Sequence, residues 1–275
     1  MSMDSIPSIP LCLGTVLIVV LAMESGFQLG RTIHRRSEEE KESSVSSIEA
    51  SILGLLAFML AFTFGLVSNR FDERKALVRQ EANAIGTAYL RAAFLPEPDR
   101  AQTARILKAY VSQRLSAVLS RDPRQMDQML ADSDRDQREL WTMAVTNARK
   151  DMNSDVAALY IESLNELVDV HRMRLAIGLQ SRVPTPIWLV FYALVLLGMF
   201  GVGYQTAIAG SRRTLTAPIL ALSFSLVITL IVELDRKRSR YVPVPQHALE
   251  NLLQRMETPA APGPNTAPAD QTAIR

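Results

Sequence analysis

The residues that most often carry enzyme chemistry are few and scattered in this chain. His34, His171 and His247 lie far apart, and Cys12 is the only cysteine. A metal site needs ligands at short, paired spacings, so no metal site is expected, and one cysteine allows no intrachain disulfide. The sequence also lacks a phosphate-binding glycine loop and a serine nucleophile elbow. We therefore expect neither an enzyme nor a cofactor.

Two further segments resemble binding motifs without meeting their requirements. The acidic segment 132–139 lacks the glycine of a calcium loop, and Arg135 and Arg138 neutralise its charge, so a solvated helix face is expected. The glycines at 198–203 are spaced like part of a nucleotide fingerprint, but no strand precedes them. Together with Gly26 and Gly30, they are more typical of close helix packing. A net charge of only +2 does not favour nucleic acid as a partner.

The most suggestive pattern lies in the apolar segment 50–69. Phe58 and Phe62 stand one helical turn apart, and Leu66 extends their face by another turn. Beside them runs a ridge of small residues at helical spacing, which consists of Gly54, Ala57, Ala61 and Gly65. The plainer interpretation is an aromatic pair that faces lipid or packs inside the protein. The more specific interpretation is that the ridge packs on neighbours while the Phe face points at a symmetry axis. Rings of apolar side chains in a narrow pore can gate conduction by dewetting.

Four long apolar segments must position these residues. Segments 5–23, 50–69, 183–211 and 214–232 contain no Asp, Glu, Lys or Arg. About 20 helical residues cross a hydrocarbon core, and only helices satisfy the backbone of single apolar segments in lipid. The predicted fold is an all-α membrane protein, with four transmembrane helices in two hairpins and a helical cytosolic insert.

The predicted parts follow from these segments. They are a first hairpin at 1–69 (spans about 9–30 and 48–69), the insert at 70–182, a second hairpin at 183–234 (spans about 186–209 and 217–234), and a basic juxtamembrane segment with a disordered Pro/Ala-rich tail at 235–275. Glu24 lies in the last third of the first span. A carboxylate there is costly unless it is interfacial or paired, so it is either such a residue or a functional one.

The helices of the insert are predicted from caps and breakers. No proline interrupts 48–94, which predicts one helix about 70 Å long, beginning at a capping box formed by Ser46 and Glu49. Asp99 and the pair Asp122-Pro123 each begin a further helix, and a bend near Ser154 precedes the last one. No sustained apolar-polar alternation predicts a strand.

Lys and Arg near the ends of the spans predict the orientation. Eleven lie on the side of the insert and both termini, against six on the opposite side. Cytoplasmic loops are enriched in these residues, so the insert and both termini are expected in the cytoplasm.

The stretch LLAFMLAFTFGLVSNRFDERKALVRQEANAIGTAYLRAAFLPEP, with ESGFQLGR in the first span and ELDRKRSR after the fourth, resembles the bacterial bestrophin-like family. The resemblance covers roughly residues 11–250. The family is similar to bestrophins, which are pentameric anion channels with four spans per subunit, cytosolic termini and an apolar neck on the second helix. The tryptophans that follow the neck in bacterial bestrophins are absent here, with Phe71 where one is expected, and no acidic calcium clasp of the animal type is evident.

The resemblance implies a homo-oligomer, namely a pentamer, in the bacterial inner membrane, with chloride or another small anion as the permeant ion. By position, Phe58, Phe62 and Leu66 are the neck candidates. In a ring, Arg70, Arg74 and Lys75 would form a cation-rich vestibule that favours anion entry.

A non-conducting signalling or scaffold protein is the alternative that the sequence leaves open. A helical bundle between membrane hairpins is also how receptors hold a sensory module. An insert outside the cytoplasm, or a monomer or dimer in detergent, would favour this alternative.

Overall fold

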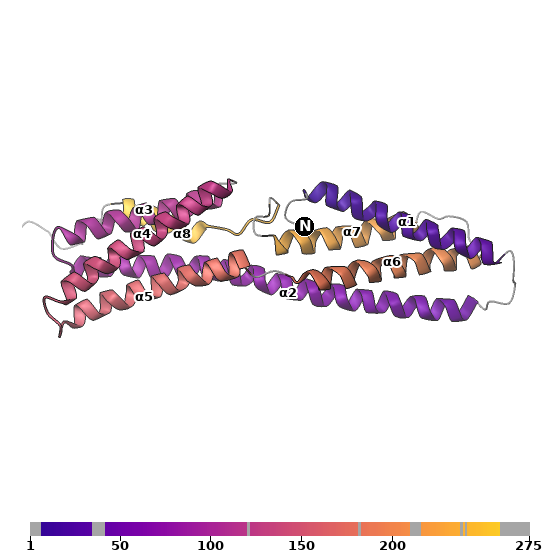
Figure 1. The fold of residues 1–275 in the computed structure, drawn as a ribbon, viewed down its shortest axis with the longest axis horizontal. Helices are drawn as coiled ribbons and strands as arrows, with labels where there is room; N and C mark the ends of the chain where they lie inside the picture. The colour runs from indigo at the N-terminus through magenta and orange to yellow at the C-terminus, as the bar shows by residue number, and fades with distance from the viewer. Residues whose placement is uncertain are drawn as a thin grey trace, which may run out of the picture. The chain divides into compact units, whose positions relative to one another are not determined.

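The computed structural model describes residues 7–34, 42–119, 122–180, 183–209, 216–236, 239 and 241–258. Within these ranges nearly every residue is helical and no strand occurs, which confirms the all-α prediction. The helices, labelled in Figure 1, are α1 (Ser8–His34), α2 (Glu42–Arg91), α3 (Asp99–Leu119), α4 (Pro123–Ala148), α5 (Asp155–Leu175), α6 (Thr185–Ile208), α7 (Thr216–Asp235) and α8 (His247–Glu257). A 3-10 turn at Ala92–Phe94 follows α2, and a π-helical turn at Ala176–Gln180 follows α5.

Four of these helices are long and apolar enough to cross a membrane: α1, α2, α6 and α7. Helices α6 and α7 begin and end within a residue of the predicted spans, α1 continues four residues past its predicted end, and α2 extends well beyond its predicted span at both ends. Helix α2 is continuous through Asn69, as its lack of proline predicts. The capping box at Ser46 as its beginning is wrong, because α2 already begins at Glu42.

The chain forms two compact units, which we describe separately. The first, called here the span unit, comprises the described parts of residues 1–74 and 176–244. Helix α1 packs against α6 and α7, and each apolar helix contributes a fully buried residue to one core: Val19, Leu56, Val195 and Ile228. The tightest helix packing therefore joins α1 to α6, and the grouping into two hairpins stays a prediction.

The second, the insert unit, comprises the described parts of residues 75–175 and 245–275. Helix α3 packs against α4 and α8, and α4 packs against α5. Asp122 caps α4 as predicted, since its carboxylate accepts a hydrogen bond from the Arg124 amide at 3.0 Å. The core of the insert unit is mostly apolar and contains fully or almost fully buried side chains such as Ile85, Leu140 and Leu167.

Helix α8 was not predicted, because its residues fall in the range 235–275 that was expected to be a juxtamembrane segment and tail. Its buried face consists of Leu249, Leu252 and Met256, and Leu252 lies against Gly86 of α2. Residues 247–257 thus belong to the core of the insert unit. The predicted disordered tail beyond residue 258 lies outside the described residues.

Candidate functional site

The aromatic pair of α2 points away from the core of the span unit. The side chains of Phe58 and Phe62 are 65% and 59% exposed, and their rings stack with centroids 6.5 Å apart. Leu66, the third neck candidate, is turned further inward and packs partly against the apolar core. Two of the three candidates thus form an apolar face that nothing in the described chain covers.

The small-residue ridge of α2 is open as well. Gly54, Ala57 and Ala61 are exposed, and Gly65 is partly exposed. A Cβ atom added at Gly54 or at Gly65 would meet no atom within 4 Å. The prediction that this ridge packs tightly on neighbours is therefore not fulfilled within one described chain.

A second set of glycines makes the close contact between α1 and α6. A Cβ atom at Gly26 would overlap the main-chain carbonyl of Phe200, and one at Gly203 would overlap that of Met23. At Gly30 it would lie 2.8 Å from the Tyr204 carbonyl oxygen. These contacts confirm the helix-packing interpretation of Gly26, Gly30 and Gly203.

The vestibule candidates lie on α2 beyond the aromatic pair. An Arg70 guanidinium nitrogen lies 3.9 Å from a carboxylate oxygen of Asp235, at the end of α7. Arg74 donates hydrogen bonds to two main-chain carbonyls there, those of Leu234 and Arg236. Lys75 follows directly and is half-buried. Two of the three cations are thus engaged by the end of α7.

Glu24 has a partner on its own helix. The Gln28 side chain donates a hydrogen bond to the Glu24 carboxylate at 3.0 Å, one helical turn away. The side chain is half-buried in the span unit. The paired interpretation of this carboxylate is the one that the contact supports.

A buried carboxylate at the end of α7 was not predicted from the sequence. Glu233 is only 4% exposed and accepts hydrogen bonds from Ser8, at the beginning of α1, and from Ser239. An Arg236 guanidinium nitrogen lies 2.6 Å from the same carboxylate and donates to the Ser8 hydroxyl at 2.8 Å. The first residue of α1 is thereby attached to the last turn of α7.

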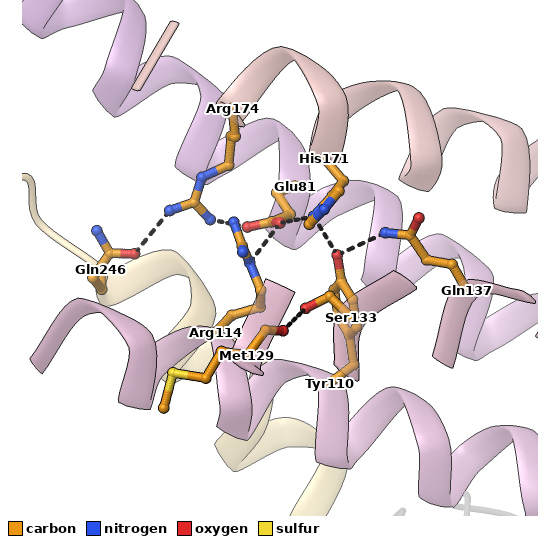
Figure 2. A network of polar contacts seen from close by, with 9 residues as sticks. All are labelled: Glu81, Tyr110, Arg114, Met129, Ser133, Gln137, His171, Arg174 and Gln246. Atoms are coloured by element: carbon orange, nitrogen blue, oxygen red, sulfur yellow. Dashed lines mark hydrogen bonds and ion pairs between the residues drawn. The ribbon is translucent and has the colours of Figure 1, made fainter. Parts of the chain in front are cut away.

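A second buried polar cluster lies in the insert unit and is drawn in Figure 2. Glu81 of α2 is fully buried between two arginines. The Arg114 Nε atom of α3 lies 3.0 Å from its carboxylate, and Arg174 of α5 donates to the other carboxylate oxygen. Glu81 therefore holds three helices together. Removing one partner of a buried ion pair leaves a charge uncompensated, which costs about 3–5 kcal/mol.

The same cluster continues through a tyrosine and a histidine. Gln137 donates to the Tyr110 hydroxyl at 3.1 Å, and this hydroxyl lies 2.9 Å from the His171 Nδ1 atom. The Tyr110 hydroxyl, which accepts from Gln137, still has its own proton to donate to Nδ1 of a neutral His171. Burial, reinforced by the positive charge of Arg114, lowers the pKa of His171 to about 4. At neutral pH the histidine is neutral, and the two arginines balance Glu81 with one positive charge to spare.

Burial also shifts the neighbouring groups toward their neutral forms. It raises the pKa of the Tyr110 phenol and lowers the pKa of Arg174 to about 10. One sequence signal could have indicated this site: Glu81 interrupts the apolar stripe of α2 that runs through Leu77, Val78 and Ile85. A carboxylate in such a stripe needs a buried partner. The partner's identity is not readable from the sequence.

Among the described residues, no group of three or more His, Cys, Asp or Glu side chains is placed to hold a metal ion. The contacts therefore offer two kinds of site. One is the open apolar face of α2, and the other comprises the polar clusters that fix helix ends.

Comparison with known proteins adds a family and a fold. A family model described as a bestrophin-like domain matches residues 16–242. Crystal structures of two variants of a bacterial bestrophin homologue from Klebsiella pneumoniae match with TM-scores of 0.65 and 0.64, each at 17% identity over 90% of this chain and over 97% and 96% of theirs. A structure described only as a membrane protein matches with a TM-score of 0.63, at 17% identity, over 90% of this chain and 96% of its own. No curated protein sequence matches the chain.

Proposed function

Since this chain belongs to the bestrophin-like family, whose model covers most of it, we propose that it is a homo-oligomeric anion channel. The permeant ion is chloride or another small anion, and the constriction is lined by Phe58 and Phe62, with Leu66 at its edge. The four apolar helices and the bestrophin fold make it a membrane protein. The oligomer proposed is a pentamer.

The open face of α2 is the observation that carries this proposal. Within the chain, α2 contributes Leu56, Leu60 and Val67 to the buried apolar core that residues of the other three apolar helices share. Its opposite face exposes a stacked aromatic pair beside a ridge without side-chain bulk. In a ring of copies, such a ridge lets the next subunit approach closely, and the aromatic pair projects toward the axis. A narrow ring of phenylalanines excludes water and thereby opposes ion passage.

The cations beyond the constriction support selection of anions. Arg70, Arg74 and Lys75 follow Phe62 by 8 to 13 residues, which corresponds to about 12–20 Å along a helix. Repeated around a ring, these charges raise the local concentration of anions at one mouth. Replacing both Arg70 and Arg74 with glutamate is expected to shift permeability toward cations, measured as a change in reversal potential.

We assign the insert and both termini to the cytoplasm of a bacterial inner membrane. The eleven-to-six distribution of Lys and Arg supports this orientation. Reporter fusions after Arg121 and at the C-terminus should both report a cytoplasmic location. If either reports the outer side, the orientation is wrong.

The test of conduction is the double variant Phe58→Ala/Phe62→Ala in proteoliposomes. Removing the bulk that excludes water should raise chloride flux above that of the unmodified protein. Phe64→Ala is the matched control, because Phe64 is also exposed on α2 but lies about 160° around the helix from Phe62. It should leave the flux unchanged.

If the double variant carries no more chloride than empty liposomes, the channel proposal fails. The non-conducting scaffold, with the insert unit as its interaction module, then takes its place. A monomeric purified protein has the same consequence, since a central pore needs a ring.

A further inference from the structure

The end of α7 presents main-chain carbonyls that the helix itself cannot satisfy. The last four carbonyls of any α-helix lack intrahelical partners, and a cationic side chain near the C-terminus can bind them. Here Arg74 donates to the carbonyl of Arg236 at 2.9 Å and to that of Leu234. Both acceptors lie within two residues of each other, which suits the forked geometry of a guanidinium.

The Arg74 side chain is also held from its own helix. Its guanidinium carbon lies 5.8 Å from the centre of the Phe71 ring, and Phe71 packs partly against the apolar core. One turn earlier, Arg70 faces Asp235, whose carboxylate accepts a hydrogen bond from the Val183 amide at 3.3 Å, just before α6 begins. One face of α2 is thus directed at the end of α7 and the beginning of α6.

The end of α7 is itself a fixed point in the span unit. Glu233 is buried there and binds Ser8 of α1 together with Arg236. Arg74 therefore attaches α2 to a place where α1 and α7 are already joined. A contact at such a place resists rotation of α2 about its own axis.

Helical geometry shows which way this contact turns the aromatic pair. At about 100° per residue, Arg74 lies within roughly 20° of Thr63 around α2, and about 160° and 120° from Phe58 and Phe62. Thr63 is 3% exposed, and Leu56, which shares this direction, is fully buried. A helix that points Arg74 at α7 must therefore point Phe58 and Phe62 away from the other three apolar helices.

We propose that Arg74 is a positioning residue that fixes the rotation of α2 and so directs Phe58 and Phe62 toward the pore axis. Its importance for the constriction rests on the proposed channel function, whereas its effect on the rotation of α2 does not. Its guanidinium acts through the geometry of two hydrogen bonds in addition to its charge. Lysine keeps the charge but is a compact ammonium without the fork, so it does not replace arginine here.

The rotation of α2 can be measured without any ion flux. In a Cys12→Ser background, a single cysteine is introduced by Thr63→Cys or by Phe62→Cys, at a buried and an exposed position respectively. With Arg74 intact, a small thiol reagent that partitions into lipid and detergent should label the cysteine of Phe62→Cys and leave that of Thr63→Cys almost unlabelled. Adding Arg74→Lys should raise the labelling rate of Thr63→Cys at least tenfold and lower that of Phe62→Cys.

The matched control is Arg79→Lys, the same exchange at an exposed arginine of the same helix. It should change neither labelling rate. If Arg74→Lys also changes neither rate, the positioning role is wrong. If Arg74→Lys does not give folded protein, Phe71→Leu weakens the support of the guanidinium more gently and should raise the Thr63→Cys rate to a smaller extent; an unchanged rate again overturns the proposal.

Flux measurements separate this inference from the channel proposal. With Arg74→Lys, chloride flux should change while the ratio of chloride to sodium permeability stays the same, because the charge is kept. A changed ratio with unchanged labelling would mean that Arg74 acts on ions through its charge alone, which contradicts the positioning role. Changed labelling in a protein that carries no chloride in any form supports the positioning role and refutes the channel.

Discussion

Two small-residue faces of the span unit share a sequence pattern and differ in their surroundings. Gly26 and Gly30 of α1 lie directly against the backbone of α6, whereas Gly54 and Gly65 of α2 face open space. Both faces have the spacing that permits close approach of helices. The difference shows that such spacing predicts a close contact but does not specify which helix makes it. Under the proposed function, the first face is satisfied within one chain and the second by another copy.

The largest loss of stability is expected from a methyl group added to the face of α1 that contains Gly26 and Gly30. Gly26→Ala places a Cβ atom onto the Phe200 carbonyl, so α1 and α6 must separate, at a cost of about 3 kcal/mol. Gly14→Ala is the control on the same helix, because a Cβ atom there meets nothing within 4 Å. It should be neutral or stabilise by up to about 1 kcal/mol, since alanine favours a helix over glycine. Thermal unfolding in detergent compares the two, and equal melting temperatures would remove the distinction between the faces.

A bulky residue at the open face should separate assembly from folding. Gly54→Leu meets no atom of its own chain, so the subunit should keep its helix content and melting behaviour. A ridge that packs on another copy loses its close approach, and overpacking of this kind costs about 1–3 kcal/mol at each contact. Light scattering should then show a smaller oligomer. A Gly54→Leu protein that assembles like the unmodified one would mean that the ridge faces lipid.

A smaller loss of stability is expected in the insert unit when the pH is lowered, a change that leaves both glycine faces unaltered. The pKa of His171 is lowered to about 4 in the folded chain, against an ordinary value of 6.5. Between these values the unfolded chain binds a proton that the folded chain does not, so stability is complete above about pH 6.5 and falls as the pH decreases toward 4. The loss at pH 5 should be about 1–2 kcal/mol.

Hydrogen exchange of α3 and α5 at pH 7 and pH 5 measures this loss in the intact protein. His171→Gln removes the titrating group and should flatten the dependence on pH. If the variant and the unmodified protein lose protection equally, the titration of His171 is not the cause.

The helices were largely predictable because their signals are local. Uncharged segments, the cap at Asp122 and the absence of proline between Ile48 and Pro96 depend on neighbouring residues alone. The missed helix α8 is only 11 residues long, and the proline-containing segment 243–246 precedes it. A helix this short forms because tertiary packing buries its apolar face, and single-sequence patterns do not report that packing.

The sites were less predictable because their partners are distant in sequence. Glu81 can be recognised as a carboxylate in an apolar stripe, but Arg114 and Arg174 are 33 and 93 residues away from it. Arg74 was assigned to an open vestibule from its charge and its place after the apolar segment. Its hydrogen bonds to the end of α7 depend on how α2 is rotated, which no local pattern specifies.

The mass of the detergent-purified protein tests the central claim that the open face of α2 is covered by other copies. Light scattering with correction for bound detergent measures the protein mass directly. We predict a particle that contains five copies of the 30.5 kDa chain. A particle with the mass of one chain would contradict this account, because the aromatic pair and the ridge would then face only lipid.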